Sequence, residues 1–241
     1  MQRFENQVVQ REQCPVSLAP PEKIDFFRHA QNRTLQDLEF VKCEFVGEGL
    51  ATYGRAVNRS AARDIRLKNC RVNSFFGIGA IFDDVSVDGL LTTRHPVILS
   101  ACALRHVVIK GKCGRFLFNR QICHDDDRRN AEFIADNDEL YRNLDWALDI
   151  TDADFSAFEI RASIPPRLIR RNPDSHFIMS RAVALSNEWK NYEPSGAFQI
   201  GVSMFLESGA DEELFVAARR SKHFEAELNF LRRLKSAELV A

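Results

Sequence analysis

Residues 65–92 read IRLKN CRVNS FFGIG AIFDD VSVDG LLT, and apolar or small residues head these groups of five. The heads are Ile65, Cys70, Phe75, Ala80, Val85 and Leu90, and a second inward candidate stands two positions after each. An α-helix repeats every 3.6 residues and a strand every two, so neither accounts for a period of five. The period predicts short extended pieces joined by corners, with two side chains of each piece in one continuous core. The chain is therefore expected to wind into a solenoid.

The same period recurs at residues 38–47 and 148–160, on either side of this stretch. Ile65 and Val85 are twenty residues apart and Val85 and Val107 are twenty-two apart, so about twenty residues per coil fit four sides. Ile109 and Ile150 are forty-one residues apart, so about one coil between them is replaced by another structure. Residues able to adopt the left-handed conformation stand where corners are expected. They are Gly47, Asn69, Gly89 and Gly111.

Two units carry a resemblance to a known family. Ala153-Asp-Phe155-Ser-Ala157 and Cys43-Glu-Phe45-Val-Gly47 resemble the A(D/N)LxG unit of pentapeptide-repeat proteins, and the likeness extends over roughly 100 of the 241 residues. The resemblance implies a mainly β fold, namely a right-handed, quadrilateral parallel β-helix. Phe or Leu is then expected at the central position of a unit, with a small residue two positions earlier.

Departures from the period divide the chain. Residues 1–33 are expected to form an N-terminal cap, with a short helix around Ile24 and Phe27. Residues 34–164 are expected to form the β-helix, interrupted at 119–147 by an amphipathic helix between Arg129 and Leu148.

Beyond Pro165-Pro166 the pattern changes to strand, helix, strand, helix. The expected elements are strands at 176–180 and 214–218, a helix at 198–206 closed by Gly209, and a last helix that begins at Ser221. Residues 165–241 are thus predicted to form a right-handed βαβα subdomain that packs on the solenoid.

Composition favours an ordinary globular protein. The net charge is −1, from 33 basic and 34 acidic residues, which does not favour a nucleic-acid partner. No apolar leader or membrane-length stretch occurs, so a cytoplasmic location without membrane contact is expected. The six cysteines form no CxxC pair, which favours free structural thiols.

The first candidate site is the acidic loop that precedes the inserted helix. His124, Asp125, Asp126 and Asp127 offer an imidazole and hard oxygen atoms. Consecutive residues seldom converge on one ion, however, and acids before a helix are favoured by its dipole. A solvated loop that caps the helix is the preferred interpretation, and no metal ligand, catalytic residue or cofactor is assigned.

Basic residues supply two further candidates. Residues 34–118 contain twelve basic and eight acidic residues, and Arg66, Lys68 and Arg71 are expected on outward positions of one coil. A second group could form an anion site at the start of the last helix. It comprises Arg167, Arg170 and Arg171 together with Arg219, Arg220 and Lys222. For both groups, solvation of outward positions is the preferred interpretation over binding.

These sequence features favour some classes of function over others. A regular scaffold without a recognisable catalytic set favours a protein-interaction, scaffold or regulatory module, such as an immunity protein, with an unidentified protein partner. One alternative is an enzyme that uses the acidic loop at 124–127 on the solenoid face. Another is implied by the family resemblance, a DNA mimic that protects a topoisomerase, but such a role calls for a strongly acidic rod.

Overall fold

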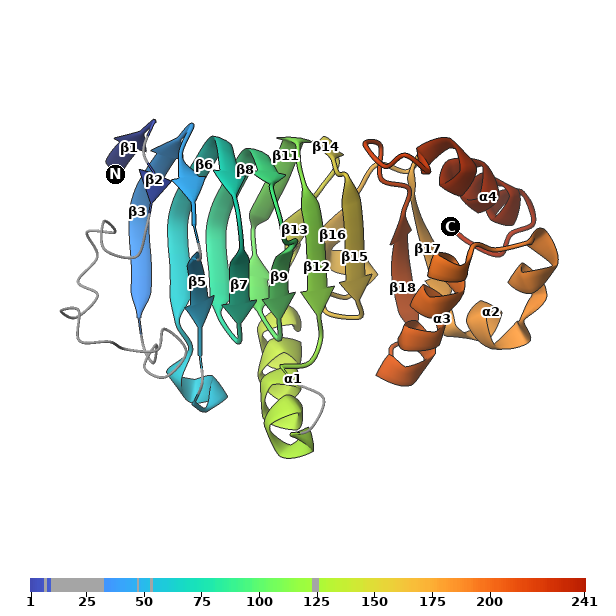
Figure 1. The fold of residues 1–241 in the computed structure, drawn as a ribbon. Helices are drawn as coiled ribbons and strands as arrows, with labels where there is room; N and C mark the ends of the chain where they lie inside the picture. Colours follow the sequence, from blue (N-terminus) through green and yellow to red (C-terminus); the bar gives the residue numbers. More distant parts are fainter. Residues whose placement is uncertain (7, 10–32, 47, 53, 123–125) are drawn as a thin grey trace.

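The computed structural model describes residues 1–6, 8–9, 33–46, 48–52, 54–122 and 126–241. Its strands lie side by side in a row that starts near the N-terminus (Figure 1). The helices α2 (Arg181–Ser186), α3 (Gly196–Ser208) and α4 (Phe224–Ser236) gather at the other end. The remaining α-helix of the described chain, α1 (Asp127–Tyr141), lies at one margin of the row.

Two parallel sheets make up the row. The larger one follows the order β1 (Gln2–Glu5), β3 (Thr34–Val41), β6 (Ala61–Val72), β8 (Ile81–Thr92), β11 (Val107–Lys112), β13 (Leu148–Asp149) and β16 (Ile169–Arg170), and the short strands β2 (Val8–Val9), β4 (Glu44–Phe45), β10 (Ala103–Arg105) and β14 (Ala153–Asp154) pair beside this path. The second sheet has the order β15 (Ala157–Arg161), β12 (Arg115–Asn119), β9 (Val97–Ser100), β7 (Phe75–Ile78) and β5 (Glu48–Ala51). The chain is therefore mainly β, with large parallel sheets and few helices.

The strand register carries the period of the sequence. Ile65 pairs with Val85, twenty residues later. The next step is twenty-two residues, from Ser86 to Val108, and the step across the inserted helix is forty-one, from Val108 to Asp149. These are the spacings that the sequence predicts for successive parallel neighbours.

Left-handed backbone marks the corners between strand segments. Asn69, Gly89 and Gly111 have φ values of 52°, 77° and 70°, so three of the predicted corners are confirmed. The fourth, Gly47, lies outside the described residues. Further corners use residues that the sequence analysis did not single out. Asp tolerates this region through local hydrogen bonding but, unlike glycine, does not by itself predict a corner. Among these further corners are Asp37, Asp64, Asp84, Ala101 and His106.

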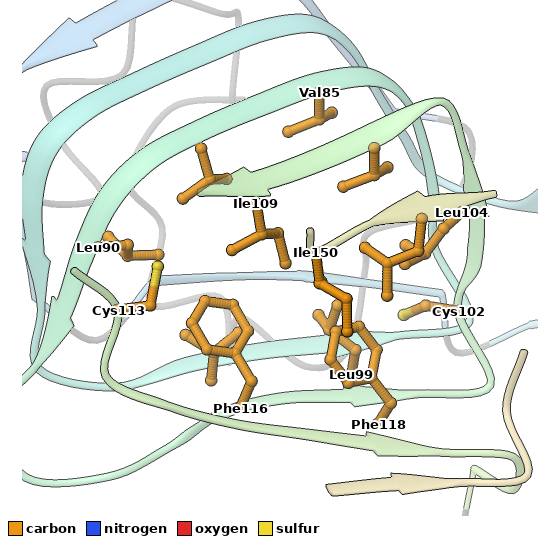
Figure 2. Packing of buried hydrophobic residues seen from close by; sticks show 14 of the residues in the cluster. Val85, Leu90, Leu99, Cys102, Leu104, Ile109, Cys113, Phe116, Phe118 and Ile150 are labelled. Carbon is orange, nitrogen blue, oxygen red and sulfur yellow. The ribbon is translucent and has the colours of Figure 1, made fainter. Parts of the chain in front are cut away.

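The residues of the five-residue period form the core between the two sheets. Ile65, Cys70, Ala80, Val85 and Leu90 are buried, and Phe75 packs against the same cluster. Figure 2 shows Val85 and Ile109 from the larger sheet and Phe116 and Phe118 from the smaller one pointing into a common interior. Non-polar side chains from both sheets are thus removed from water together, which is the main stabilising term.

The described cysteines are part of this core. Cys43, Cys70, Cys102 and Cys113 are free and buried, as predicted. Burial raises the pKa of the Cys102 thiol to about 12 and that of Cys113 to about 11. The Cys102 and Cys113 thiols are therefore protonated and inert at neutral pH.

Two predicted helix boundaries need correction, and one predicted helix is not tested. The helix expected around residues 24–27 lies outside the described residues, and residues 2–5 form a parallel strand beside β3. The inserted helix ends at Tyr141 and does not extend to Leu148, which belongs to β13. Helix α4 begins at Phe224 and not at Ser221, which lies in the turn before the helix.

The C-terminal strands also differ from the expected crossover. β17 (His176–Ser180) and β18 (Glu212–Val216) pair in antiparallel fashion. A right-handed βαβ crossover requires parallel strands, so that part of the prediction is wrong. The order strand, helix, strand, helix is present, with α2 and a 3-10 helix added after β17. A separate apolar cluster that includes Phe177, Phe205 and Leu231 holds these elements together.

Candidate functional site

Arg59 fixes α1 against the strands of the two parallel sheets, which we call the repeat strands. Its side chain is 2% exposed and forms an ion pair with Asp136 of α1 at 2.6 Å. It also donates to the carbonyl oxygens of Gly79 and Ala101 at 2.8 and 2.5 Å, and to Asn137 at 2.7 Å. A buried guanidinium is tolerated because its donors are satisfied in this way.

Next to these hydrogen bonds, α1 comes close to the corner at Gly79. Phe133 is fully buried, and its ring lies under the Arg59 guanidinium at 5.0 Å. Gly79, with a φ of 59°, faces the same ring, and a Cβ atom at this position would collide with it. The corner glycine therefore leaves the space into which α1 inserts its largest apolar side chain.

A pocket of 730 Å³ lies where α1, the end of the repeat strands and the C-terminal elements meet. Its walls come from α1, from the segment 162–167 that follows β15, from the start of α2, and from the segment 209–212 that leads into β18. We call it the junction pocket. Because the three regions are far apart in sequence, the pocket depends on the docking of α1.

Both signs of charge line the junction pocket, but they are engaged differently. Arg120 lies 3.6 Å from Asp138, Arg167 donates to the Tyr141 carbonyl oxygen, and Arg181 donates to those of Leu206 and Ala210. In the part of the chain that the structure describes, the carboxylates of Asp211 and Glu212 take part in no ion pair, and both residues are exposed. The pocket thus offers free acidic groups beside arginines that are held by the protein itself.

Glu213 lies directly behind this pocket. It is 5% exposed, and it accepts hydrogen bonds from the backbone N–H groups of Ala162 at 2.8 Å and Leu214 at 2.9 Å. Burial raises the pKa of its carboxyl group from 4.5 to about 8, against the opposing effect of these two bonds. Glu213 is therefore largely protonated at neutral pH, and it joins β18 to the left-handed corner at Ala162.

The raised pKa of Glu213 predicts a pH-dependent stability. Between about pH 4.5 and 8 the folded protein holds a proton that the unfolded chain releases, so stability falls as the pH rises through this range. We expect Glu213→Gln to flatten the decrease in melting temperature between pH 6.5 and 8. Thermal unfolding of both proteins across this interval checks the prediction, and equal slopes would contradict it.

The acidic loop is only partly described. His124 and Asp125 lie outside the described residues. Asp126 is the N-cap of α1 and accepts a hydrogen bond from the Arg129 backbone N–H at 3.0 Å, and Asp127 lies in the first turn. Asp126 thus caps the helix, as the preferred interpretation expects, and Asp127 stands where the helix dipole favours an acid.

Arg66, Lys68 and Arg71 are exposed on β6, as expected, but acids lie beside them. Glu39 pairs in register with Arg66, Asp88 with Lys68, and Glu44 with Arg71. Lys110, on the next strand, lies 3.8 Å from Asp88. Acidic and basic side chains therefore lie next to one another on adjacent strands, which stabilises the pairing of these strands and leaves no continuous basic stripe on this face of β6. We call one repeat of about twenty residues with its strands a rung.

The five C-terminal arginines are distributed over different partners. Arg167 lines the junction pocket, Arg170 lies 4.2 Å from the Trp146 ring, and Arg171 donates to the His176 carbonyl oxygen at 2.5 Å. Arg219 lies 3.8 Å from Asp154, and Arg220 donates to the Cys113 carbonyl oxygen at 2.5 Å. The structure thus does not gather all five in one place.

A second, more open hollow of 670 Å³ contains part of the predicted anion site. Arg219, Arg220 and Arg232 line it together with Asp154, Asp174 and Glu225, so the charges balance. His176, next to the lining residue Ser175, is buried. Burial, and secondarily Arg171 and Arg219, lowers the pKa of His176 to about 4. Anion binding here remains a prediction.

Sequence reasoning missed Arg59 and Glu213, which organise the junction. The partners of Arg59 on α1 lie more than seventy-five residues away, so no local pattern marks it. Glu213 lies in a strand beside apolar residues, and the sequence alone does not distinguish a glutamate buried in a strand from one that faces solvent. Its role follows from the tertiary structure, in which its carboxylate accepts a hydrogen bond from the Ala162 backbone N–H.

No family model, curated protein or solved structure matches the chain. Within the described residues, no helix combines the length and apolar character that a membrane crossing requires.

Proposed function

We propose that this chain is a non-enzymatic interaction module whose junction pocket binds a segment of a protein partner. The regular strands serve as a rigid scaffold in this proposal, and the elements that break the period provide the binding site. The observation that carries the proposal is the pocket itself, which three distant parts of the chain build around unpaired acidic groups.

We further infer that the scaffold is a right-handed, four-sided β-helix of the pentapeptide-repeat type. Steps of twenty and twenty-two residues support this inference, as do left-handed corners after segments of about five residues. In the unit at 153–157, the small residue Ala153 and the central residue Phe155 are both buried, as these two positions of such a unit should be. A scaffold of this kind carries no chemistry of its own, so the function is sought at the junction.

The chemistry of the pocket points to the type of segment it takes. Asp211 and Glu212 are exposed and free to accept charge-assisted hydrogen bonds. The pocket arginines are already engaged, Arg120 in an ion pair with Asp138 and the others as donors to carbonyl oxygens. Ile134, Ile164 and Pro165 add apolar surface. We therefore propose an extended partner segment with Lys or Arg side chains among apolar ones.

Charge reversal in the pocket tests the proposal. We expect the double variant Asp211→Lys/Glu212→Lys to lose, by roughly ten-fold or more, a partner that the native protein retains from lysate of its own host. The retained proteins are quantified by mass spectrometry at low and physiological salt. The matched control is Glu188→Lys/Glu207→Lys, which makes the same change of charge at exposed positions outside the pocket.

The control determines how the result is interpreted. Retention of the partner by the control and its loss from the pocket variant would support the junction pocket as the binding site. An identical set of retained proteins for all three chains, or no enriched protein at either salt concentration, would refute the proposal.

A further inference from the structure

Three potential metal ligands converge at one corner of the repeat strands, away from the junction pocket. Asp83 and Asp84 belong to β8, and His106 stands between β10 and β11 on the neighbouring rung. One ligand atom from each of the three lies within 4.8 Å of the others. Because Asp83 pairs in register with Arg105, the backbone itself holds these side chains side by side.

The histidine is oriented by a second carboxylate on its far side. His106 Nε2 lies 2.9 Å from Asp145 Oδ1, whereas Nδ1 faces Asp84 at 3.7 Å. Donation from Nε2–H to Asp145 leaves the Nδ1 lone pair directed toward the acids of β8. Metal-ligating histidines are typically held in this way, with the second nitrogen bonded to a carboxylate.

Aromatic packing restricts the imidazole further. The Trp146 ring packs against His106 with ring centroids 4.9 Å apart, and the Arg170 guanidinium covers Trp146 at 4.2 Å. Asp145 and Trp146 lie in the segment between α1 and β13, so the imidazole is held from outside its own rung. A ligand whose rotamer is already fixed loses little entropy when a metal binds.

The charge of this corner favours a cation. Asp37, Asp64 and Asp84 each stand between residues that pair in register on β3, β6 and β8, so they follow one another in one column across strands about 4.8 Å apart. Like charges at such spacing repel. Two arginines offset part of this negative charge: Arg105 lies 3.5 Å from Asp83, and Arg63 pairs with Asp83 in register.

We propose that Asp83, Asp84 and His106 bind one divalent transition-metal ion, with Asp145 as the carboxylate that orients the histidine. One nitrogen and two carboxylate ligands suit Zn²⁺, which binds such donors at about 2.0–2.2 Å. Binding requires these ligand atoms, which lie within 4.8 Å of one another, to come closer together, and the exposed Asp84 side chain has room to rotate. Water completes the coordination, and the ion ties two neighbouring rungs together.

Zinc titration of the metal-free full chain tests the site. We expect saturable binding of one Zn²⁺ per chain by isothermal titration calorimetry and a higher melting temperature with Zn²⁺ than without it. His106→Gln and Asp84→Asn should abolish both effects, and Asp145→Asn should weaken binding by about 10-fold or more.

Two control variants separate this site from unspecific binding. Asp64→Asn changes the neighbouring acid of the same column, and His124→Gln removes the histidine of the acidic loop; both should bind Zn²⁺ within about 3-fold of the native affinity. The proposal is overturned if the native chain shows no saturable binding, if His106→Gln binds like the native protein, or if His124→Gln is the variant that loses zinc.

Discussion

Replacing Arg59 with methionine is expected to lower the free energy of unfolding by about 3 kcal/mol or more and to loosen α1. The substitution removes the ion pair with Asp136 and leaves the carbonyl oxygens of Gly79 and Ala101 without this donor. Buried acceptors that lose a partner cost their full desolvation energy. Urea unfolding measures the change in stability, and hydrogen exchange of residues 127–141 measures the loosening of the helix.

The neighbouring Arg55 provides a control on the same loop. It forms an ion pair with Glu132 of α1 at 3.4 Å, but its side chain is 77% exposed. Arg55→Met should therefore cost less than about 1 kcal/mol, because exposed ion pairs contribute little. If the two variants lose the same stability, or if α1 remains protected in Arg59→Met, Arg59 is not the anchor described here.

Gly114→Ala is expected to destabilise the protein by about 3 kcal/mol, or to prevent folding, because it overpacks the contact between two rungs. A Cβ atom on Gly114 would collide with the backbone nitrogen and the hydroxyl oxygen of Thr92, and backbone atoms cannot move aside cheaply. The Gly114 N–H also donates to the Leu90 carbonyl oxygen at 2.8 Å. Soluble yield and the midpoint of urea unfolding report the effect.

Gly196→Ala is the corresponding control. A Cβ atom there meets no atom within 4 Å, and the residue begins α3. The change should be neutral or stabilise the helix by up to about 1 kcal/mol, since alanine favours helix over glycine. A Gly114→Ala protein as stable as the native one would contradict the close approach of the rungs.

The parallel strands could be predicted because their period is local and repeated. The first residues of the five-residue groups from Ile65 to Leu90 are buried at regular intervals, so the period is recognisable even though one of them, Phe75, is only partly buried. Corners at glycine or asparagine were also predictable. Corners at Ala101 and His106 were not, because the neighbouring rungs impose the left-handed backbone and the side chains do not favour it.

The C-terminal elements and the junction were harder to predict. Spacing identified the helix around Phe205 and the strand around Leu214, but the direction of strand pairing depends on tertiary packing. Arg59 and Glu213 gain their roles only from partners that are remote in sequence. The basic residues of β6 were correctly placed outward, yet their acidic neighbours belong to other rungs and were not paired with them.

Hydrogen exchange of the full chain, with and without the partner retained by the native protein, tests the central claim most directly. If the junction pocket is the binding site, protection should concentrate in residues 134–138, 162–167 and 209–212, which line it. The exposed face of β6 around Arg66 and Lys68 should exchange unchanged. Protection confined to that face, with the junction unaffected, would place binding on the repeat strands and contradict the account.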